Sequence, residues 1–339
     1  MHSRFHFICK MFSENIEERI FELKSENDFL QLALEIFQVQ ARENNVYKEF
    51  IELQKVNVDA VNSLEKIPFL PIEFFKTHEV VTGNFSAEKI FSSSGTTSEN
   101  RSNHFVKSLS LYEKSFLESF RKFFGEPSEF VFLALLPSYI ERNDSSLIYM
   151  TEKLIHLSND SRSGFYLESN SELLNTLHEL NAEKKKHILL GVTFALLDFP
   201  FQKNENYLHT IIMETGGMKG RRREMIREEV HQLLKEKSGT EKIYSEYGMT
   251  ELLSQAYSKG EGNFLTPPWM KILIREANDS NEILVQKQSG AINVIDLANI
   301  HSCCFIATSD LGKINSDGSF SVLGRMDNSD VRGCNLMIG

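Results

Sequence analysis

Apolar strand-like runs alternate with helix-like stretches through the middle of the chain, and this alternation constrains the fold more than any other feature of the sequence. The runs are short and rich in Ile, Leu, Val and Phe, whereas the stretches between them carry apolar residues at helical spacing. Strands separated by helices favour an α/β fold, with mainly parallel sheets covered by helices. The predicted strands lie at 130–136, 164–167, 188–191, 211–213 and 242–244, and the predicted helices at 111–124, 146–157, 171–180 and 222–237.

The two ends of the chain differ from the middle. An apolar stripe at helical spacing from Ser13 to about Asn44 predicts a helical segment that begins at the serine. From Trp269 onward the apolar runs become short and alternating, at 272–274, 283–285, 292–295 and 320–323, with glycines as turn residues. We therefore predict a helical N-terminal segment at 1–66, an α/β core at 67–268 and a β-rich subdomain at 269–339.

Composition excludes several classes of protein. Hydrophobic residues make up 41% of the 339 residues and charged residues 25%, which is ordinary for a globular protein and argues against a disordered chain. The formal net charge of −10 works against non-specific nucleic-acid binding, because that binding comes mostly from neutralising phosphates. The longest nearly apolar run, 188–197, is well short of the roughly 20 residues that a membrane span needs. The N-terminus lacks a clean signal-peptide pattern and the four cysteines form no CxxC pair, so we expect a reduced, cytoplasmic protein.

A strand-like run at 89–91 leads into a loop that is rich in hydroxyl groups. The loop contains Ser93, Ser94, Gly95, Thr96 and Thr97. Backbone N–H and side-chain O–H groups in such a loop can converge on phosphate oxygens, and the basic Arg101 four residues later favours an anion site. An ordinary solvated turn is the alternative. The pattern is not GxxxxGK[ST], which occurs nowhere in the chain.

A second candidate segment runs from Tyr247 to Glu251, directly after another strand-like run. The Tyr247 ring can stack on a base, Gly248 permits a turn, and Thr250 offers a hydroxyl. The Glu251 carboxylate can hold a Mg²⁺ ion that bridges phosphates. The alternative is the start of a helix, with Thr250 as its cap.

Asp310 and three of the cysteines each allow two interpretations. Asp310 can accept hydrogen bonds from ribose hydroxyls, or it can form an Asx turn. Cys303 and Cys304 lie in an apolar context that favours a buried strand pair over metal binding, and the ten histidines show no HExxH or comparable ligand spacing. Cys334 has polar neighbours, and Arg332 two residues away favours the nucleophilic thiolate, with a packed thiol as the alternative.

The order of these motifs along the chain resembles the acyl-adenylate-forming (ANL) superfamily, which includes acyl-CoA synthetases, adenylation domains and luciferases. The stretch 93–101 resembles its phosphate loop, with Arg101 where the loop's lysine usually stands. The stretch 247–251 resembles its aromatic and Mg²⁺ motif. The resemblance further implies a ribose-binding Asp310, a Gly-Arg pair before a hinge at Gly324 and Arg325, and an adenine-contacting segment formed by Thr215, Gly216, Gly217 and Met218.

Within the superfamily the chain most resembles the LuxE-type acyl-protein synthetases, the fatty-acid-activating component of bacterial bioluminescence, and after them the phenylacetate-CoA ligases. The resemblance covers roughly residues 65–339 and rests on the stretches 68–76, 136–142, 145–147 and 332–336. It implies a large adenylate-forming fold with a β-rich C-terminal part.

Two features depart from the broad superfamily. Ser98 and Asn100 stand where its phosphate loop prefers Gly and Pro. The chain also ends fourteen residues after Arg325, so we expect the superfamily's C-terminal lid domain, with its catalytic lysine, to be absent. The LuxE-type proteins end early as well, and the resemblance implies that a cysteine near the C-terminus receives the acyl group, which here is Cys334.

The resemblance implies ATP-dependent activation of a carboxylic acid, expected to be a fatty acid, to acyl-AMP with release of pyrophosphate. Transfer of the acyl group to a thiol follows, with Cys334, Thr250 and Glu251 as the catalytic residues and Glu251 as the Mg²⁺ ligand. The expected cofactors are ATP and Mg²⁺. The expected partner is an acyl reductase, an acyltransferase or a carrier protein, with no nucleic acid and no membrane span. Two alternatives stay open: a ligase core that transfers the acyl group to CoA or a carrier protein, with Cys334 only packing, and a nucleotide-binding partner protein that is not catalytic.

Overall fold

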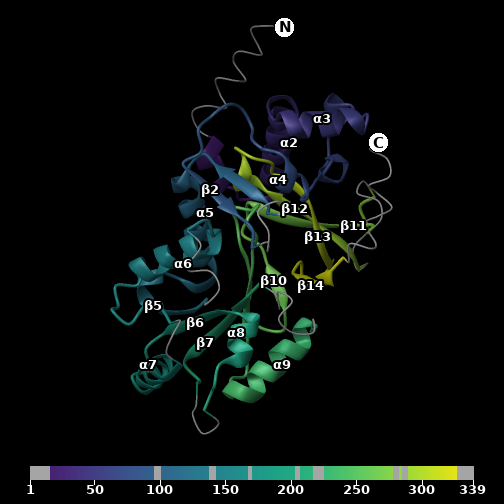
Figure 1. Ribbon diagram of the computed structural model, residues 1–339. Helices are drawn as coiled ribbons and strands as arrows, with labels where there is room; N and C mark the ends of the chain where they lie inside the picture. Colours follow the sequence, from purple (N-terminus) through teal and green to yellow (C-terminus); the bar gives the residue numbers. More distant parts are fainter. Residues whose placement is uncertain are drawn as a thin grey trace.

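The computed structural model describes residues 16–94, 101–136, 143–166, 170–202, 207–216, 225–277, 282–284 and 289–326. Within these residues one twelve-stranded sheet dominates the molecule, together with a separate two-stranded sheet. Figure 1 shows the N-terminal helices beside the C-terminal strands at one end of the molecule, and the helices of the middle part of the chain at the other end.

Five neighbouring strands of the large sheet are parallel. In spatial order they are β5 (Gly164–Phe165), β4 (Val131–Leu135), β6 (His187–Val192), β7 (Thr210–Thr215) and β8 (Tyr244–Tyr247). Each connection between them carries a helix or a long crossover, as parallel strands require. The predicted α/β architecture is confirmed, and each of these strands overlaps a predicted one.

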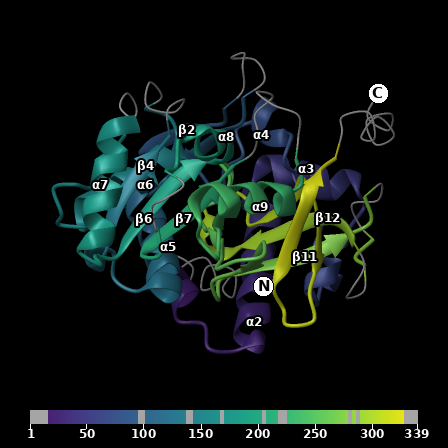
Figure 2. The same ribbon diagram turned by 90° about the horizontal axis from the view of Figure 1, so that it is seen from below.

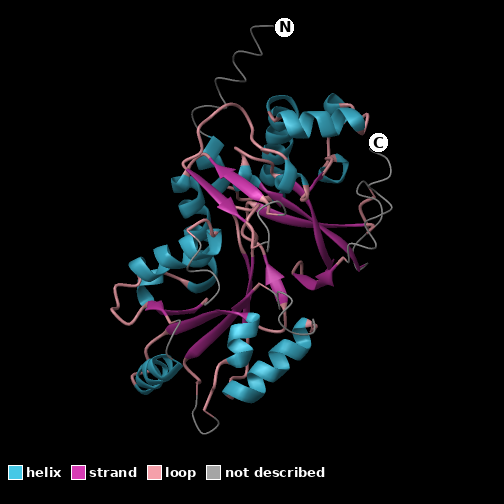
Figure 3. Cartoon of the chain, viewed as in Figure 1, coloured by secondary structure: helices cyan, strands magenta, loops and turns pink. Residues whose placement is uncertain are grey.

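The other half of the sheet is mainly antiparallel. It continues from β8 through β9 (Ala256–Ser258), β10 (Asn263–Leu265), β14 (Phe320–Arg325), β13 (Phe305–Ile314), β12 (Ser289–Asp296) and β11 (Met270–Arg275). The short β1 (Leu70–Pro71) pairs parallel with β13. The β-rich C-terminal part is therefore confirmed, although it belongs to the same continuous sheet as the parallel strands (Figure 3).

Helices cover both faces of the parallel strands. The helices α5 (Leu109–Phe124) and α6 (Ser146–Leu157) pack on one face, where Phe132 of β4 points, and the flanking Val131 and Leu133 point to the other face. That other face is covered by α7 (Asn170–Ala182), α8 (Thr193–Asp198) and α9 (Arg227–Ser238). The view from below looks onto α7 and α9 (Figure 2). Strands that are apolar on both faces appear in the sequence as continuous hydrophobic runs. For this reason their positions could be predicted.

The N-terminal helices α2 (Glu26–Glu43) and α3 (Asn45–Leu53) pack into one core with the C-terminal strands. The helical segment predicted from Ser13 to about Asn44 is present in the described part, as two helices and not one. Residues 16–21 are helical, the chain then turns, and Ser25 caps α2 by accepting a hydrogen bond from the Asp28 amide. Ser25 is thus the true start signal of the long helix. Ser13 itself lies outside the described residues.

Shorter elements complete the described chain. They are the helix α4 (Phe74–Thr77), the hairpin strands β2 (Lys89–Ser92) and β3 (Asn103–Val106), and the 3₁₀ turns η1 (Val58–Ala60), η2 (Leu64–Lys66), η4 (Pro127–Glu129) and η5 (Leu297–Asn299). Of the predicted strand at 283–285, only an isolated bridge between Ile283 and Arg275 is present in the described residues. No helix in the described part of the chain combines the length and the apolar character that a membrane crossing demands.

Cys303 and Cys304 are fully buried, as predicted, but they precede β13 and do not form part of it. The physical reason is that buried Gln40 of α2 holds their loop in an irregular conformation. The Gln40 amide group donates to the carbonyls of Asn299 and Ser302, both at 3.2 Å, and accepts from the Cys304 amide at 2.9 Å. These backbone groups are therefore satisfied without strand pairing.

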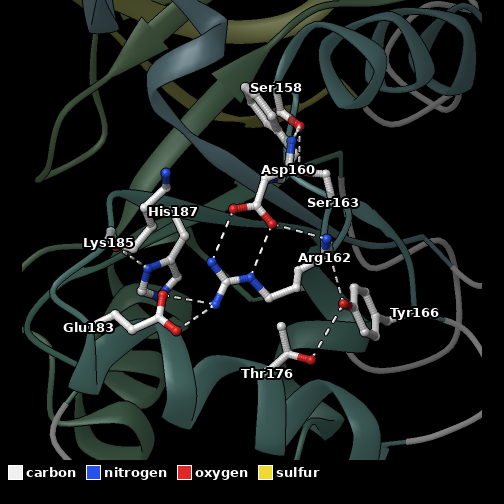
Figure 4. A network of polar contacts seen from close by, with 10 residues as sticks. Ser158, Asp160, Arg162, Ser163, Tyr166, Thr176, Glu183, Lys185 and His187 are labelled. Carbon is white, nitrogen blue, oxygen red and sulfur yellow. Dashed lines mark hydrogen bonds and ion pairs between the residues drawn. The ribbon is translucent and has the colours of Figure 1, made fainter.

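A polar network holds the loops that lead into the amino ends of β5 and β6 (Figure 4). The Arg162 guanidinium pairs with Asp160 at 3.0 Å and with Glu183 at 2.9 Å. Close by, His187 donates from Nδ1 to the Lys185 carbonyl at 2.7 Å. Because this edge of the parallel strands is occupied by structural contacts, the opposite, carboxyl edge is where a ligand site is expected.

Candidate active site

Two of the predicted glycines follow neighbouring strands at the carboxyl edge of the sheet. Gly216 follows β7 and Gly248 follows β8, and the pairing of Thr215 with Glu246 places these strand ends side by side. Gly216 has φ +70°, a conformation that side-chain-bearing residues rarely adopt. At Gly248 an added Cβ would lie 2.4 Å from Oε1 of Glu246. The turn at Gly216 therefore favours glycine through its backbone conformation, whereas a side chain at position 248 would require the Glu246 carboxyl group to shift.

Three predicted residues from distant parts of the chain meet in one hydrogen-bonded group. The Tyr247 hydroxyl donates to Oδ2 of Asp310 at 2.9 Å, and Nε of Arg325 donates to Oδ1 of the same carboxylate at 3.1 Å. Tyr247 and Asp310 are buried, whereas the Arg325 side chain is 74% exposed. Burial and the Asp310 charge raise the pKa of Tyr247 well above its usual value, and the same charge raises the pKa of Arg325. The tyrosine is thus a neutral donor and the arginine a permanent cation.

The structure excludes the local alternatives for two predicted residues. Asp310 lies within β13, paired with Arg325 of β14, and so does not form an Asx turn. Thr250 does not cap a helix, because residues 249–255 form a turn and an irregular stretch that lead into β9.

Glu251 is buried beside the β2–β3 hairpin. Burial raises the pKa of its carboxyl group, while a hydrogen bond from Ser102 and the positive charges of Arg325 and Lys76 act in the opposite direction. The net shift is upward. The Glu251 carboxyl group therefore lies between the hairpin and the Tyr247–Asp310–Arg325 group. A cation bound there would favour the ionised form of Glu251.

The predicted phosphate loop is closed at its base by Arg101. The guanidinium donates from Nε to the Ser93 carbonyl at 2.8 Å and forms an ion pair with Asp144. The Ser93 hydroxyl accepts from the Ser102 amide at 2.9 Å. Arg101 thus holds the two ends of the loop together, and its contact with a phosphate stays a prediction. Ser94 follows β2, at the last described position before the loop.

Several predicted residues lie outside the described part of the chain. They are Gly95, Thr96, Thr97, Gly217, Met218 and Cys334. Their roles stay predictions. Two of these segments begin directly after described residues, Ser94 after β2 and Gly216 after β7.

Two buried glutamates, which were not among the predicted site residues, lie on opposite faces of this strand pair. Glu246 accepts a hydrogen bond from the Thr215 hydroxyl, and burial together with the charge of Glu214 raises its pKa to about 7. Burial also acts to raise the pKa of Glu214, but Arg227 at 3.2 Å and His231 at 3.5 Å outweigh it, so the net shift is downward. A charged residue inside an otherwise apolar strand run was the available signal.

Comparison with known proteins gives a match in structure only. No known family model and no curated protein matches the sequence. The structure resembles ATP-bound MatB from Rhodopseudomonas palustris with a TM-score of 0.51 and 16% identity, over 70% of this chain and 47% of that chain. It also resembles 2-hydroxyisobutyryl-CoA ligase in an open conformation, in complex with 2-HIB-AMP and CoA. There the TM-score is 0.62 and the identity 12%, over 89% of this chain and 71% of that chain.

These likenesses concern the arrangement of helices and strands, because the sequence identities are low. The chain spans about half the length of the MatB structures that it matches, at 47% and 49%. In the described residues this arrangement consists of the parallel strands and their antiparallel extension, with the covering helices. The chain therefore has the fold of adenylate-forming enzymes.

Proposed function

We propose that this protein activates a carboxylic acid with MgATP, forming acyl-AMP and pyrophosphate, and then transfers the acyl group to a thiol. The observation that carries the proposal is the meeting of Tyr247, Asp310 and Arg325 beside buried Glu251 at the carboxyl edge of β7 and β8. These residues come from three separate stretches of the sequence. A hydrogen-bonding carboxylate, a cation and an aromatic ring at one edge suit a ribose, a phosphate and a base.

The residues present fit a magnesium nucleotide. The Glu251 carboxyl group is an oxygen donor of the kind that Mg²⁺ prefers, and its raised pKa would return toward normal beside a cation. Each Asp310 oxygen has one protein donor and thus keeps capacity to accept from a ribose hydroxyl. Bound Mg²⁺ would supply charge neutralisation for the phosphates.

The proposed first step joins a carboxylate oxygen of the acid to the α-phosphorus of ATP and breaks the bond from that phosphorus to the bridging oxygen, so that pyrophosphate leaves. Exposed Arg325 can offset negative charge during this step, because Asp310 holds only its Nε. Glu251 would hold the Mg²⁺ ion, and the hydroxyl of the neighbouring Thr250 would donate a hydrogen bond to the phosphates. In the second step a thiolate attacks the acyl carbon and AMP leaves.

A cluster of apolar side chains around a small internal space supports a hydrophobic acid as the substrate. The space between these side chains has a volume of only about 10 Å³, roughly room for one water molecule, and it reaches Met213 and Glu246, which are close to the strand ends that carry Gly216 and Tyr247. Its other lining residues are Phe120, Phe132, Met150, Leu154, Ile188, Leu190 and Tyr257. We propose a fatty acid as the substrate class, with its carboxylate at the strand ends and with these side chains moving apart to admit the tail.

For the acceptor thiol we propose Cys334, from which a partner such as an acyl reductase, an acyltransferase or a carrier protein would take the acyl group. The second candidate is transfer to CoA or to a carrier protein. It is favoured by the likeness to 2-hydroxyisobutyryl-CoA ligase, whose structure holds both 2-HIB-AMP and CoA.

Carboxylate-dependent exchange between ATP and labelled pyrophosphate tests the first step. We expect exchange with fatty acids of one length class, and we expect Glu251→Gln to lower its rate by about 100-fold or more, since the amide keeps the shape but loses the charge. MgATP binding is measured on the same samples. Glu118→Gln, on the exposed side of α5, is the matched control and should leave exchange unchanged.

Exchange that persists in Glu251→Gln would remove Glu251 from the chemistry. Binding of MgATP without exchange for any fatty or aryl acid would contradict the enzyme proposal. It would favour the alternative that the chain is a nucleotide-binding partner protein without catalytic activity. Dependence of product formation on added CoA, with no labelled chain, would favour the second candidate.

Asp310→Ala tests the ribose contact. The substitution leaves the buried Tyr247 hydroxyl without its acceptor and removes the proposed partner of the ribose, so we expect about tenfold weaker ATP binding. Titration calorimetry measures the affinity, and 2′-deoxy-ATP distinguishes the mechanism. If Asp310 binds the ribose, the variant should discriminate between ATP and 2′-deoxy-ATP less than the wild type does; unchanged discrimination would contradict the contact.

A further inference from the structure

The short turn that carries Thr250 and Glu251 is held by side chains from three distant elements. Two of its backbone carbonyls accept hydrogen bonds from buried polar side chains. Nδ1 of His104, on β3, lies 2.8 Å from the Thr250 carbonyl oxygen, and Nδ2 of Asn299, on η5, donates to the Glu251 carbonyl at 2.7 Å. Both side chains are 1% exposed. The carbonyls at the candidate catalytic position are therefore fixed from two sides.

The protonation of His104 follows from this geometry. A carbonyl oxygen can only accept, so Nδ1 of the ring carries the proton. Burial lowers the pKa of His104 to about 4, which keeps the ring neutral near physiological pH. The ring also lies edge-to-face against Phe75, with the centroids 6.0 Å apart. Its orientation is thus fixed by packing as well as by the hydrogen bond.

Asn299 is itself held in place from the N-terminal helix. The Asn299 side chain also donates from Nδ2 to the Cys303 carbonyl at 3.0 Å. The Asn299 backbone carbonyl accepts from Nε2 of Gln40, on α2, at 3.2 Å. Gln40 is fully buried. A continuous buried polar path therefore runs from α2, through the loop after η5, to the backbone of Glu251.

The next residues of the turn are fixed in the same way by Asp296. Its Oδ2 accepts from the amides of Leu253 and Ser254 at 2.8 and 3.0 Å. Its Oδ1 accepts from the Ser254 hydroxyl at 2.6 Å and from the Ala298 amide at 3.1 Å. Four donors thus compensate a fully buried carboxyl group.

We propose that His104 and Asn299 are positioning residues for Glu251, and that Gln40 holds Asn299 in place. This inference rests on the proposed function of Glu251. Between Gly248 and Gln255 the turn has no helix or sheet ladder, and its internal backbone hydrogen bond runs from the Leu252 amide to the Met249 carbonyl at 3.1 Å. The internal bond and Asp296 hold the neighbouring residues of the turn, so loss of the donor to the Thr250 or Glu251 carbonyl is expected to shift the Glu251 carboxyl group.

His104→Phe tests the proposal, because it keeps a ring of similar shape and removes the donor to Thr250. We expect the Mg²⁺ concentration for half-maximal pyrophosphate exchange to rise about tenfold, with a smaller change in KM for the acid, since one buried carbonyl loses its partner. His104→Asn keeps a donor near the position of Nδ1 and should recover most of the wild-type Mg²⁺ dependence. Asn299→Leu should act in the same direction as His104→Phe.

His187→Phe is the matched control. His187 is also buried and also donates from Nδ1 to a backbone carbonyl, but at the amino end of β6, in the network of Figure 4. We expect it to lower the thermal midpoint as His104→Phe does and to leave the Mg²⁺ dependence unchanged. The comparison separates a loss of stability from a loss of positioning.

Each outcome bears on one of the two claims. Unchanged Mg²⁺ dependence in His104→Phe, or an equal change in His187→Phe, would overturn the positioning role while exchange by the wild type still supports the proposed function. A wild-type protein that shows no exchange with any acid would instead overturn the proposed function, and the positioning role with it. Faster amide hydrogen exchange across residues 249–254 in His104→Phe, absent in His187→Phe, is the expected structural signature.

Discussion

Replacing Cys334 by alanine is expected to abolish covalent labelling of the chain when the protein is incubated with MgATP and a radiolabelled fatty acid. The thiolate is the nucleophile that the proposed second step requires, and no other group in the proposal can form a thioester. Pyrophosphate exchange should persist in the same variant, because adenylate formation precedes the transfer. Gel autoradiography after denaturation, with and without hydroxylamine to cleave a thioester, measures the label.

The other cysteines supply the controls for this experiment. Cys303 and Cys304 are fully buried, and burial raises the pKa of Cys303 to about 12 and that of Cys304 well above its ordinary value, so both stay protonated and inert. Cys303→Ala should therefore keep the label in any folded sample, and so should Cys9→Ala. Label that survives in Cys334→Ala would show that Cys334 is not the acceptor. Label that is absent from the wild type, with acyl-CoA formed on addition of CoA, would favour the ligase alternative.

Replacing Glu246 by glutamine is expected to stabilise the protein at pH 8 by about 3 kcal/mol relative to the wild type and to change little at pH 4.5. Burial raises the pKa of Glu246 from 4.5 to about 7 in the folded protein. Below pH 4.5 the folded and unfolded chains both hold the proton. As the pH rises to about 7, the unfolded chain releases it first, so the wild type loses stability and the uncharged glutamine does not. Glutamine can still accept the Thr215 hydroxyl hydrogen.

Glu214 provides the matched control with the opposite sign. Its pKa is lowered on balance, because Arg227 and His231 outweigh the effect of burial. Its contribution to stability is therefore present above the unfolded pKa and is lost as the pH falls. Glu214→Gln should destabilise the protein at pH 8 and less so in acid. Urea unfolding at several pH values measures both variants, and an equal stability difference for Glu246→Gln at pH 5 and pH 8 would contradict the raised pKa.

The fold was largely predictable because its parallel strands are apolar on both faces. The run at 130–136 contains no polar residue that would obscure the hydrophobic pattern of the strand. The helix predicted at 146–157 has the same bounds in the structure. The antiparallel strands β9 and β10 were missed. Each has only three residues. They pair with each other, Phe264 with Ser258, and β10 also pairs with distant β14, Phe264 with Phe320. No local periodicity records such contacts.

Site residues that belong to a recognisable motif could be predicted from the sequence. Residues that hold such a motif in place could not. Tyr247, Asp310 and Arg325 were singled out from three separate stretches, and the structure brings them into hydrogen-bonding contact. His104 and Asn299 gave no signal, because a lone histidine or asparagine in the sequence does not reveal which carbonyl it will meet. Their partner turn is separated from His104 by 146 residues. Such long-range pairs follow only from the folded chain.

The N-terminal segment illustrates the same difference. Its helical spacing was visible in the sequence, but its contacts with the C-terminal part of the chain were not. Buried Gln40, on the apolar face of α2, turns out to bind the loop that leads to β13. A buried glutamine on an apolar helix face is the kind of exception that marks a specific hydrogen-bonding partner.

The transfer of oxygen from the acid to AMP is the most direct measurement of adenylate formation. A fatty acid with both carboxylate oxygens replaced by oxygen-18 is turned over with MgATP and an acceptor thiol, and the isolated AMP is examined by mass spectrometry. We expect one heavy oxygen in each AMP, because the carboxylate oxygen that attacks the α-phosphorus stays with it when the thiol takes the acyl group. AMP without heavy oxygen, or ADP as the nucleotide product, would contradict activation through an acyl adenylate.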